Sequence, residues 1–297
     1  MPRVSVEEAA QTLRAGGLAG VPTETVYGLA ADGLNEVAVR AIYARKGRPP
    51  RHPLILHLLD EPHRYGVLDG RARDLIAAFW PGPLTLVVPR RPIVPEVVTG
   101  GHPTVALRAP DHSTMQALLL QTDRPLAAPS ANRFGRVSPT TAEHVLEEFP
   151  DLDVVDGGAC LFGIESTIVD LSGAEASLLR LGALSAEALA AVVGPLCLGG
   201  PTAAPGTLAA HYAPSAQVHV TEAPATLAAT LRAEGLRVGV LHALPAAEYA
   251  ATLYARLRAL DGPDVDVIVA ELCRDGGLGD AVNDRLRRAA AAGVPVR

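Results

Sequence analysis

Short apolar runs alternate with longer amphipathic segments along the first part of the chain. Runs bounded by glycine or proline predict buried strands, and they cover residues 18–21, 54–58, 84–88, 104–107 and 168–171. Helical spacing of apolar positions predicts helices between them, over residues 35–45, 71–79, 113–121 and 140–149. A capping box of Ser5 and Glu8 predicts one more helix near the start. Strands interleaved with helices indicate a layered α/β or α+β domain, which we assign to residues 1–195.

A stretch without Asp, Glu, Lys or Arg follows, over residues 188–221. Its prolines and glycines predict a linker, which we place at residues 196–216, and they exclude a membrane-spanning helix. Beyond it the pattern predicts alternating strands and helices, with strands over residues 218–220, 238–241 and 265–270 and helices over residues 223–232, 246–260 and 278–292. This alternation indicates a small parallel sheet with helices packed on it, in a C-terminal domain of residues 217–297.

The composition narrows the class of protein. Among 297 residues, 26 basic and 32 acidic side chains leave a net charge of −6, so we expect no membrane attachment and no strong direct binding of nucleic acid. Hydrophobic residues make up 48% of the chain, which excludes general disorder. The three cysteines form no CxxC pair, so we predict neither a disulfide framework nor a thiolate zinc site. Because Glu7 and Glu8 stand where a signal peptide needs its apolar core, we expect a soluble, cytoplasmic protein.

Lysine is nearly absent, because 25 of the 26 basic residues are arginine and Lys46 is the only lysine. It lies in the densest basic segment, which has no acidic residue between positions 37 and 59 and contains Arg40, Arg45, Lys46, Arg48 and Arg51. These cations complement the dipole at a helix C-terminus, or they form a site for a polyphosphate. No Walker loop and no GxGxxG after a strand is present, so side chains would have to bind a nucleotide.

Polar side chains also gather near the ends of the predicted strands. They are Thr23, Glu24, Thr25, Arg108, Ser130, Asn132, Glu165, Ser166, Thr167 and Arg180. Open α/β sheets bind ligands at strand ends, so these positions predict a ligand site. The alternative for the threonines is an ordinary turn in which their hydroxyls bond the local backbone.

Other motifs are missing or have a simpler interpretation. The nine histidines include no HExxH pair, so we predict no metal ligands, and no GxSxG elbow marks a serine nucleophile. Near the C-terminus, Arg285, Arg287 and Arg288 are interpreted as a solvated helix end.

Six segments stand in the order found in a known family: VPTETVYGLAAD, KGR followed by HPLILHL, WPGPLTLVV, TVALRAP, PLAAPSANRFGRVSPT and GIESTIVDL. Together they resemble the YrdC-like domain of threonylcarbamoyl-AMP synthases, whose KxR and SxN signature stands here as Lys46, Arg48, Ser130 and Asn132. PGTLAAHYAP and AVNDRLRRAA resemble the linker and C-terminal domain of the long form. The resemblance implies a YrdC-like twisted mixed sheet flanked by helices, a linker closing over the active site, and a smaller Rossmann-like three-layer α/β domain.

The resemblance also implies a reaction. This family condenses L-threonine, bicarbonate or CO2, and ATP into L-threonylcarbamoyl-AMP and pyrophosphate. A downstream transferase then moves the threonylcarbamoyl group to an adenosine beside the anticodon of tRNA. Mg²⁺ is expected with ATP, although the resemblance names no protein ligands for it.

Residue roles follow by motif position. The resemblance implies catalytic roles for Lys46 and Arg48. The L-threonine side is expected to contain Thr25, His57, Arg108, Ala128 and Ser166. The ATP side is expected to contain Arg48, His52, Thr104, Ser130, Asn132, Ser138, Arg180 and Tyr212. His52 stands where many relatives have asparagine, so this nucleotide contact departs from the family pattern.

Two other functions were weighed against this one. The first is a non-catalytic module that binds double-stranded RNA, which the acidic balance and the lack of interleaved aromatic and basic residues disfavour. The second is a carbamoyl-phosphate-dependent transferase using the same domain, which usually carries zinc or acylphosphatase modules that the sequence does not resemble.

Overall fold

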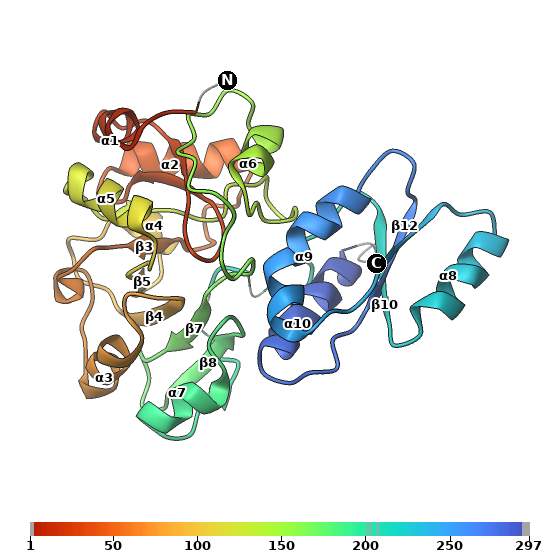
Figure 1. Ribbon diagram of the computed structural model, residues 1–297. Helices are drawn as coiled ribbons and strands as arrows, with labels where there is room; N and C mark the ends of the chain where they lie inside the picture. Colours follow the sequence, from red (N-terminus) through yellow and green to blue (C-terminus); the bar gives the residue numbers. More distant parts are fainter. Residues whose placement is uncertain (1–2, 201, 203, 207, 293–297) are drawn as a thin grey trace.

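A computed structural model describes residues 3–200, 202, 204–206 and 208–292. Its N-terminal domain contains a curled mixed sheet of nine strands in the order β1-β2-β6-β3-β5-β4-β7-β8-β9 (Figure 1). The strands are β1 (Ala19–Val21), β2 (Gly28–Asp32), β3 (Ile55–His57), β4 (Leu84–Pro89), β5 (Thr104–Arg108), β6 (Leu126–Ala127), β7 (Thr167–Asp170), β8 (Ser177–Arg180) and β9 (Cys197–Leu198). The predicted layered mixed sheet is confirmed.

Helices build two hydrophobic clusters against this sheet. Helices α1 (Val6–Arg14) and α5 (Ser113–Thr122) pack on each other and on β1. The main core contains side chains from α2 (Glu36–Lys46), α3 (Gly70–Phe79), α4 (Glu96–Thr99), α6 (Ala142–Glu148) and α7 (Ala186–Val193). A short 3-10 helix spans Pro62–Arg64.

The opposite face of the central strands carries a smaller apolar cluster. Its members are Ile55, Val87, Ala106, Ile168 and, from the linker, Ala204. Because side chains alternate along a strand, His57 and Arg108 point to this face too. They stand opposite each other where the parallel strands β3 and β5 end. The period of the sheet therefore directs an imidazole and a guanidinium to the face on which the linker lies.

The C-terminal domain has the predicted three-layer arrangement. Its parallel strands β10 (Gln217–Thr221), β11 (Val238–Leu241) and β12 (Val267–Glu271) stand in the order β10-β12-β11. Its helices are α8 (Pro224–Ala233), α9 (Ala246–Leu260) and α10 (Leu278–Ala291). Along β12, Val267 and Val269 pack toward α8, whereas Ile268 and Ala270 pack toward α9 and α10.

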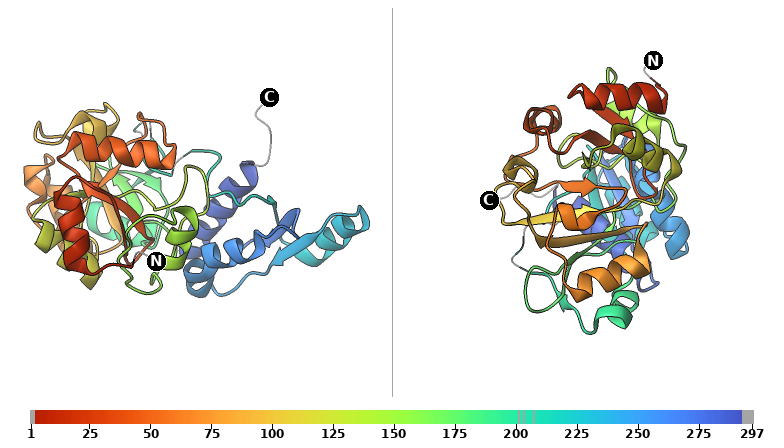
Figure 2. Two further views of the ribbon diagram at one scale, coloured as in Figure 1. Left: turned by 90° about the horizontal axis from the view of Figure 1, so that it is seen from above. Right: turned by 90° about the vertical axis from the view of Figure 1, so that its left-hand side faces the viewer.

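Helices α9 and α10 lie between the small sheet and the N-terminal domain, and α8 lies on the far side (Figures 1 and 2). The contact is close at Gly163, where an added Cβ would come within 2.4 Å of the Ala251 carbonyl oxygen and 2.5 Å of that of Ala250. Val26 and Ile164 share one buried cluster with side chains of these helices. The two domains therefore share a packed interface around the linker.

Most predicted elements have a counterpart, but several short ones were missed. The strand β2 has five buried or nearly buried residues without polar alternation, so its period gave no signal. The two-residue strand β9 pairs with β8 inside the segment 196–216 that we proposed as linker. The division at residues 1–195, 196–216 and 217–297 therefore remains our proposal.

Candidate active site

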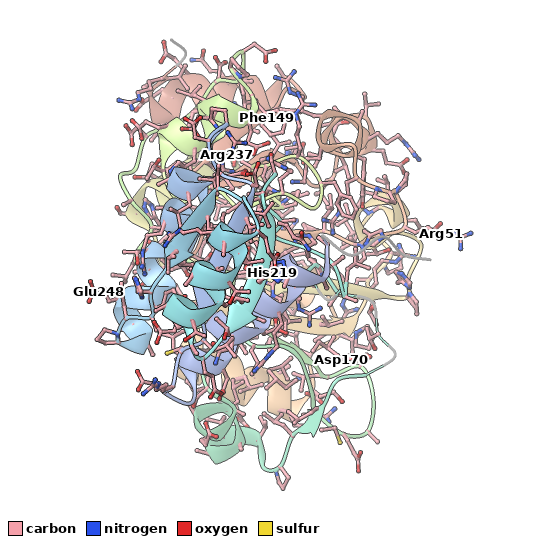
Figure 3. All side chains as sticks on the ribbon, turned by 90° about the vertical axis from the view of Figure 1, so that its right-hand side faces the viewer. Arg51, Phe149, Asp170, His219, Arg237 and Glu248 are labelled. Carbon is pink, nitrogen blue, oxygen red and sulfur yellow. The ribbon has the colours of Figure 1, made fainter. Side chains whose placement is uncertain are left out.

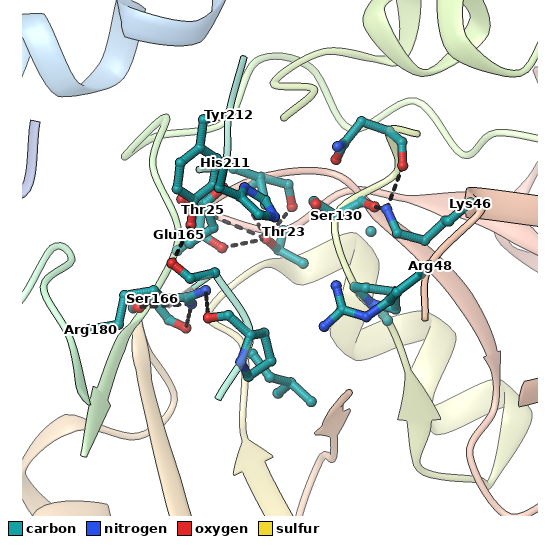
Figure 4. Close-up of a pocket in the computed structure, with 18 of the residues that line it drawn as sticks. Thr23, Thr25, Lys46, Arg48, Ser130, Glu165, Ser166, Arg180, His211 and Tyr212 are labelled. Carbon is teal, nitrogen blue, oxygen red and sulfur yellow. Dashed lines mark hydrogen bonds between the residues drawn. The ribbon is translucent and has the colours of Figure 1, made fainter. Parts of the chain in front are cut away.

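A pocket lies where the central strands and the linker meet (Figure 4). Its wall contains residues from four places: the bend after β1, the end of α2, the edge of the sheet, and the linker. The cavity volume is about 50 Å³. Residues of the linker, among them Pro205, Gly206 and Tyr212, form part of its wall, so the linker covers the pocket.

The turn after α2 sends two cations into the pocket. Gly47 ends the helix with φ 64°, a left-handed conformation that suits glycine. The buried Lys46 ammonium donates hydrogen bonds to the backbone carbonyls of Ser130 and Asn132 (Figure 4). Burial, with the nearby Arg48 guanidinium, holds the pKa of Lys46 well below its usual value. An anion in the pocket would therefore stabilise the charged form of this lysine.

Arg48 is held as firmly as the lysine. Its guanidinium donates to the carbonyl oxygen of Pro53 at 2.9 Å and to that of His52 at 3.3 Å. It also lies over the ring of Phe134, 5.7 Å from the centroid. Burial lowers the pKa of Arg48 to about 10, which leaves it charged at neutral pH.

The other basic residues of this segment lie outside the pocket. Arg40 and Arg45 form ion pairs with Glu36 and Asp151. Arg51 is exposed and projects away from the molecule (Figure 3). The dense basic segment therefore divides into two buried cations that line a pocket and three at the surface.

Arg108 is fixed by buried groups of the bend after β1. It forms an ion pair of 2.6 Å with Glu24, and both side chains are at most 4% exposed. It also donates to the Thr25 hydroxyl at 2.9 Å and to the carbonyl of Gly82 at 3.3 Å. Although burial opposes ionisation, Arg108 holds the pKa of Glu24 below its usual value. The Thr23 hydroxyl lies 2.9 Å from that of Thr25 and donates to the Val26 carbonyl, as the local-turn alternative predicts, and both threonines line the pocket.

His57 stands beside this ion pair as a neutral base. The imidazole is fully buried, and burial, assisted by Arg108, lowers its pKa to about 3. It therefore adds polarity without charge to the pocket wall.

Ser166 connects the sheet edge with the linker. Its hydroxyl lies 2.8 Å from that of Thr85 and accepts from Arg180 at 3.1 Å. Arg180 also donates to the carbonyl of Pro205 in the linker at 2.8 Å (Figure 4). A strand-end arginine thus holds the closed linker against the sheet.

Tyr212 completes the linker wall. It is 1% exposed, has φ 61°, and stacks on Tyr254 of α9 with the ring centroids 5.7 Å apart. Its hydroxyl donates to the carbonyl of Gly206 at 3.4 Å. An added Cβ at Gly206 would lie 2.2 Å from that hydroxyl, so glycine is required for this closure.

The carboxylate of Glu165 joins the pocket to the C-terminal domain. It accepts hydrogen bonds from Ser138 at 2.6 Å, from Tyr254 at 2.8 Å and from Arg285 at 2.9 Å. The side chain of Arg285 is fully buried. Our interpretation of this arginine as part of a solvated helix end is wrong, because its position on α10 faces the domain interface. The neighbouring Arg287 is exposed, as expected.

Among the described residues, no group of three or more His, Cys, Asp or Glu side chains is arranged to hold a metal ion. The same residues contain no helix with both the length and the apolar character needed to cross a bilayer.

Two family models cover most of the chain. The Sua5, YciO and YrdC family model, described as "Telomere recombination", matches residues 11–182. The model described as "Threonylcarbamoyl-AMP synthase, C-terminal domain" matches residues 184–291. The chain belongs to the threonylcarbamoyl-AMP synthase family.

Full-length relatives agree with this assignment. A threonylcarbamoyl-AMP synthase of Pyrococcus abyssi is 41% identical over 95% of this chain and 92% of its own length. That of Bacillus subtilis is 38% identical over 97% of this chain and 94% of its own length. The crystal structure of P. abyssi Sua5 complexed with L-threonine has a TM-score of 0.91 and 39% identity, and covers 97% of this chain and 94% of that one.

The pocket brings together eleven of the fourteen side chains that the resemblance to threonylcarbamoyl-AMP synthases implied. They are Thr25, Lys46, Arg48, His57, Arg108, Ala128, Ser130, Asn132, Ser166, Arg180 and Tyr212. Two others are one contact away, because Ser138 donates to Glu165 and the ring of His52 packs edge-on against Phe134. Thr104 does not line the pocket and begins β5 at the end opposite to Arg108. Its role in this synthase-family chain remains a prediction.

The sequence placed Glu24 and Glu165 among the candidate ligand-site residues without indicating their partners, and it did not indicate Thr85 or Tyr254, which support the pocket. Thr85 shares the strand parity of Val87, which points to the pocket face, so alternation along β4 could have found it. Tyr254 and Arg285 come from a domain 89 and 120 residues further along the chain than Glu165. Periodicity within one element contains no signal for such contacts.

Proposed function

We propose that this protein is an L-threonylcarbamoyladenylate synthase, which condenses L-threonine, bicarbonate or CO2, and ATP into L-threonylcarbamoyl-AMP and pyrophosphate. One observation supports this most directly. A single pocket is lined by the Thr25 hydroxyl and by four cationic side chains, Lys46, Arg48, Arg108 and Arg180. That is the charge arrangement needed to join an amino acid to a nucleotide.

The threonine half of the pocket comprises Glu24, Thr25, His57, Arg108 and Ala128. We assign the substrate carboxylate to Arg108, since a guanidinium binds carboxylates through two parallel hydrogen bonds. The small Ala128 leaves space for a short side chain, and Thr25 offers a hydroxyl for the amino acid. Ser166 lies at the border of this half.

The nucleotide half comprises Arg48, Ser130, Ser138, Arg180 and Tyr212, with Asn132, His52 and Thr104 as further expected contacts. We assign the phosphates to the two guanidiniums, which stay charged in this buried setting. Tyr212 presents an aromatic face and Ser138 a hydroxyl to the nucleoside.

The chemistry then needs position and positive charge. The threonine amine nitrogen adds to the carbon of CO2 and loses a proton, which gives a carbamate. A carbamate oxygen attacks the α-phosphorus, the bond from that phosphorus to the oxygen bridging to the β-phosphate breaks, and pyrophosphate leaves. We assign to Lys46 the negative charge shared by the carbamate and the α-phosphate, and to Arg48 the leaving phosphates. Val26 and the apolar wall exclude water from the adenylate.

Mg²⁺ would enter as part of its ATP complex. The two carboxylates next to the pocket are already paired, Glu24 with Arg108 and Glu165 with Arg285. These residues therefore do not form a cation cage, and we assign no step of the reaction to a protein-bound metal.

ATP is too large for the closed cavity, so it must enter with the linker displaced. The bonds that would break include those from Arg180 to Pro205 and from Tyr212 to Gly206. We propose that Pro205, Gly206 and Tyr212 move away from the pocket to admit ATP and return for the reaction.

The product suggests the cellular context. A mixed anhydride of this kind is short-lived in water, so a transferase acting on tRNA would have to take it up directly. We therefore propose that the protein acts in the cytoplasm, where tRNA is modified.

The test is release of pyrophosphate from Mg·ATP and bicarbonate with L-threonine, L-serine or no amino acid. We expect clear stimulation by L-threonine and a weaker response to L-serine. Absence of any response to threonine would contradict the proposed function. Binding of double-stranded RNA that survives Lys46→Ala, without pyrophosphate release, would instead favour the RNA-binding alternative.

A further inference from the structure

The second domain reaches the pocket through one arginine of α10. Arg285 has no exposed side-chain surface. It donates to Glu165 at 2.9 Å and to the carbonyl of Leu181 at 2.7 Å, and it lies 2.8 Å from Asp284. Both Glu165 and Leu181 belong to the N-terminal domain side of the interface. An interdomain bridge thus ends on a carboxylate of the pocket wall.

A negatively charged carboxylate in this wall is energetically unfavourable unless a nearby cation compensates its charge. Glu165 lines a pocket whose proposed substrates are a triphosphate and an amino-acid carboxylate. A buried carboxylate beside such anions is strongly unfavourable unless it is paired with a positive charge. Burial acts to raise the pKa of Glu165, but Arg285 and then Arg180 overcome it and lower the pKa to about 2. Arg285 is therefore the main counter-charge of an ionised Glu165.

The same arginine supports the closed linker. Its guanidinium carbon lies 5.2 Å from the centroid of the Tyr212 ring, a cation–π contact. One turn further along α10, Arg288 donates to the carbonyl of Leu208 and accepts, through its own carbonyl, from the amide of His211 at 3.2 Å. Helix α10 therefore contacts the linker at Leu208, at His211 and at the ring of Tyr212.

We propose that Arg285 is a positioning residue of the nucleotide half, acting through two groups: it neutralises Glu165, which in turn orients the Ser138 hydroxyl, and it supports the ring of Tyr212. This inference rests on the proposed function. It gives the C-terminal domain a defined part in binding ATP and none in binding threonine, whose half of the pocket Arg285 does not contact.

Several charged or titratable groups face Glu165 from the elements packed against it. They are Arg180 on β8, His211 and Tyr212 on the linker, Tyr254 on α9 and Arg285 on α10. Burial lowers the pKa of His211 to about 3, and burial raises the pKa of both tyrosines. Between pH 6 and 8 these groups keep one protonation state, so a pH dependence that appears after loss of Arg285 comes from Glu165.

The experiment compares Arg285→Met, Glu165→Gln, the double variant, and Arg287→Met as a control at an exposed neighbouring arginine. Calorimetry measures the Kd of a non-hydrolysable ATP analogue and of L-threonine, and pyrophosphate release gives the two KM values. We expect Arg285→Met to weaken nucleotide binding at least about tenfold while threonine affinity changes less than about threefold. Arg287→Met should match the wild type.

Two readouts separate compensation of charge from a merely structural role. The double variant should bind the nucleotide at least about fivefold more tightly than Arg285→Met, because a neutral amide needs no counter-charge. In Arg285→Met, the guanidinium that lowers the pKa of Glu165 is gone and burial still raises it, so the pKa of Glu165 rises. Nucleotide affinity relative to wild type should therefore improve as the pH falls from 8 to 6.

The inference is overturned if Arg285→Met binds the nucleotide like wild type, or if the double variant binds it no better than Arg285→Met. If Arg285→Met does not fold, the double variant and Arg285→Lys take its place. Both should fold and bind the nucleotide within about tenfold of wild type, and failure of either overturns the inference. A wild type that binds ATP without threonine-dependent pyrophosphate release would contradict the proposed function, while the nucleotide affinities still decide on Arg285.

Discussion

The two halves that we propose for the pocket are built in different ways. The threonine half comes from one domain, with Arg108 fixed by Glu24, Thr25 and the Gly82 carbonyl within the curled sheet and the bend after β1. The nucleotide half is assembled from three parts of the chain, because Arg180 holds the linker and Arg285 of the second domain holds Glu165. The first half is thus preformed, and the second depends on linker and domain positions.

This difference suggests how much rearrangement each substrate requires when it binds. A preformed half can bind a small amino acid with little rearrangement. The nucleotide half forms only when the linker closes, and ordering the linker costs free energy. Substitutions should therefore fall into two classes that raise the KM of one substrate and leave the other nearly unchanged. Lys46, which lies where the halves meet, belongs to neither class.

The largest effect is expected for Lys46→Arg. The ammonium fits between the carbonyls of Ser130 and Asn132 in a fully buried site, and a planar guanidinium cannot take the same position. We expect threonine-dependent pyrophosphate release to fall at least about 100-fold with the fold retained. Arg45→Lys changes the preceding, partly exposed residue and is the control. Its rate of pyrophosphate release should be near normal. Near-normal turnover of Lys46→Arg would remove the special role of the lysine.

Gly206→Ala should affect the nucleotide half alone. The new Cβ would meet the Tyr212 hydroxyl at 2.2 Å, and φ is +73°. We expect the KM for ATP to rise about tenfold and the linker to become more sensitive to limited proteolysis, with the KM for threonine little changed. Gly199→Ala is a matched control, because Gly199 has the same φ and no atom within 4 Å of the added Cβ. Equal effects of the two substitutions would assign the loss to backbone strain instead of the linker contact.

Glu24→Gln should affect the threonine half alone. It leaves the buried Arg108 without its ion-pair partner, so we expect a stability loss of about 3 kcal/mol and a rise of about tenfold in the KM for threonine. Urea unfolding and pyrophosphate release at saturating ATP measure the two quantities. Glu36→Gln, in an exposed pair with Arg40, is the control. A larger effect on the KM for ATP than on that for threonine would contradict independent halves.

Acid should weaken the interface at Glu165. A carboxylate whose pKa is lowered on folding stabilises the protein above its unfolded pKa, and this contribution is lost as the pH falls through the folded value. For Glu165 the window runs from about 4.5 down to about 2, and the contribution is on the order of 3 kcal/mol. Urea unfolding of wild type and Glu165→Gln between pH 5 and 3 should show a shallower loss for the variant. Parallel curves would show that Glu165 is not ionised at a lowered pKa.

The smallest effect is expected for Arg40→Ala. Its ion pair with Glu36 spans 3.5 Å, and its side chain is 65% exposed, so less than about 0.5 kcal/mol of stability should be lost. Both KM values should stay at wild type. A shift in the KM for ATP would extend the nucleotide half to the surface of α2.

The sequence predicted the threonine half better than the nucleotide half, for a physical reason. Arg108 ends an apolar strand, so the period of two and the Gly and Pro boundaries locate it, whereas His57 was expected from the family resemblance alone. Lys46 and Arg48 flank a glycine at a helix end, which is also a local signal. Alternation along a strand and a glycine at a helix end are both visible in a few neighbouring residues, so they locate such positions without knowledge of the rest of the fold.

Contacts between distant segments had no such signal. Arg285 looked like any arginine near a helix end, and only the packing of α10 on the N-terminal domain buries it. Thr104 shares the strand and the parity of Arg108, yet it lies four residues away, roughly 13 Å along the strand. The strand β9 has two residues, fewer than any periodicity requires. Tertiary packing decides these cases.

The bridge between Glu165 and Arg285 spans 120 residues of chain. During synthesis at about 5–20 residues per second, Glu165 emerges roughly 6–24 s before its partner exists. If the N-terminal domain folds in that interval, Glu165 lacks its counter-charge until Arg285 has been made. We therefore expect an unfinished chain to consume little ATP, so that the order of translation delays the onset of catalysis.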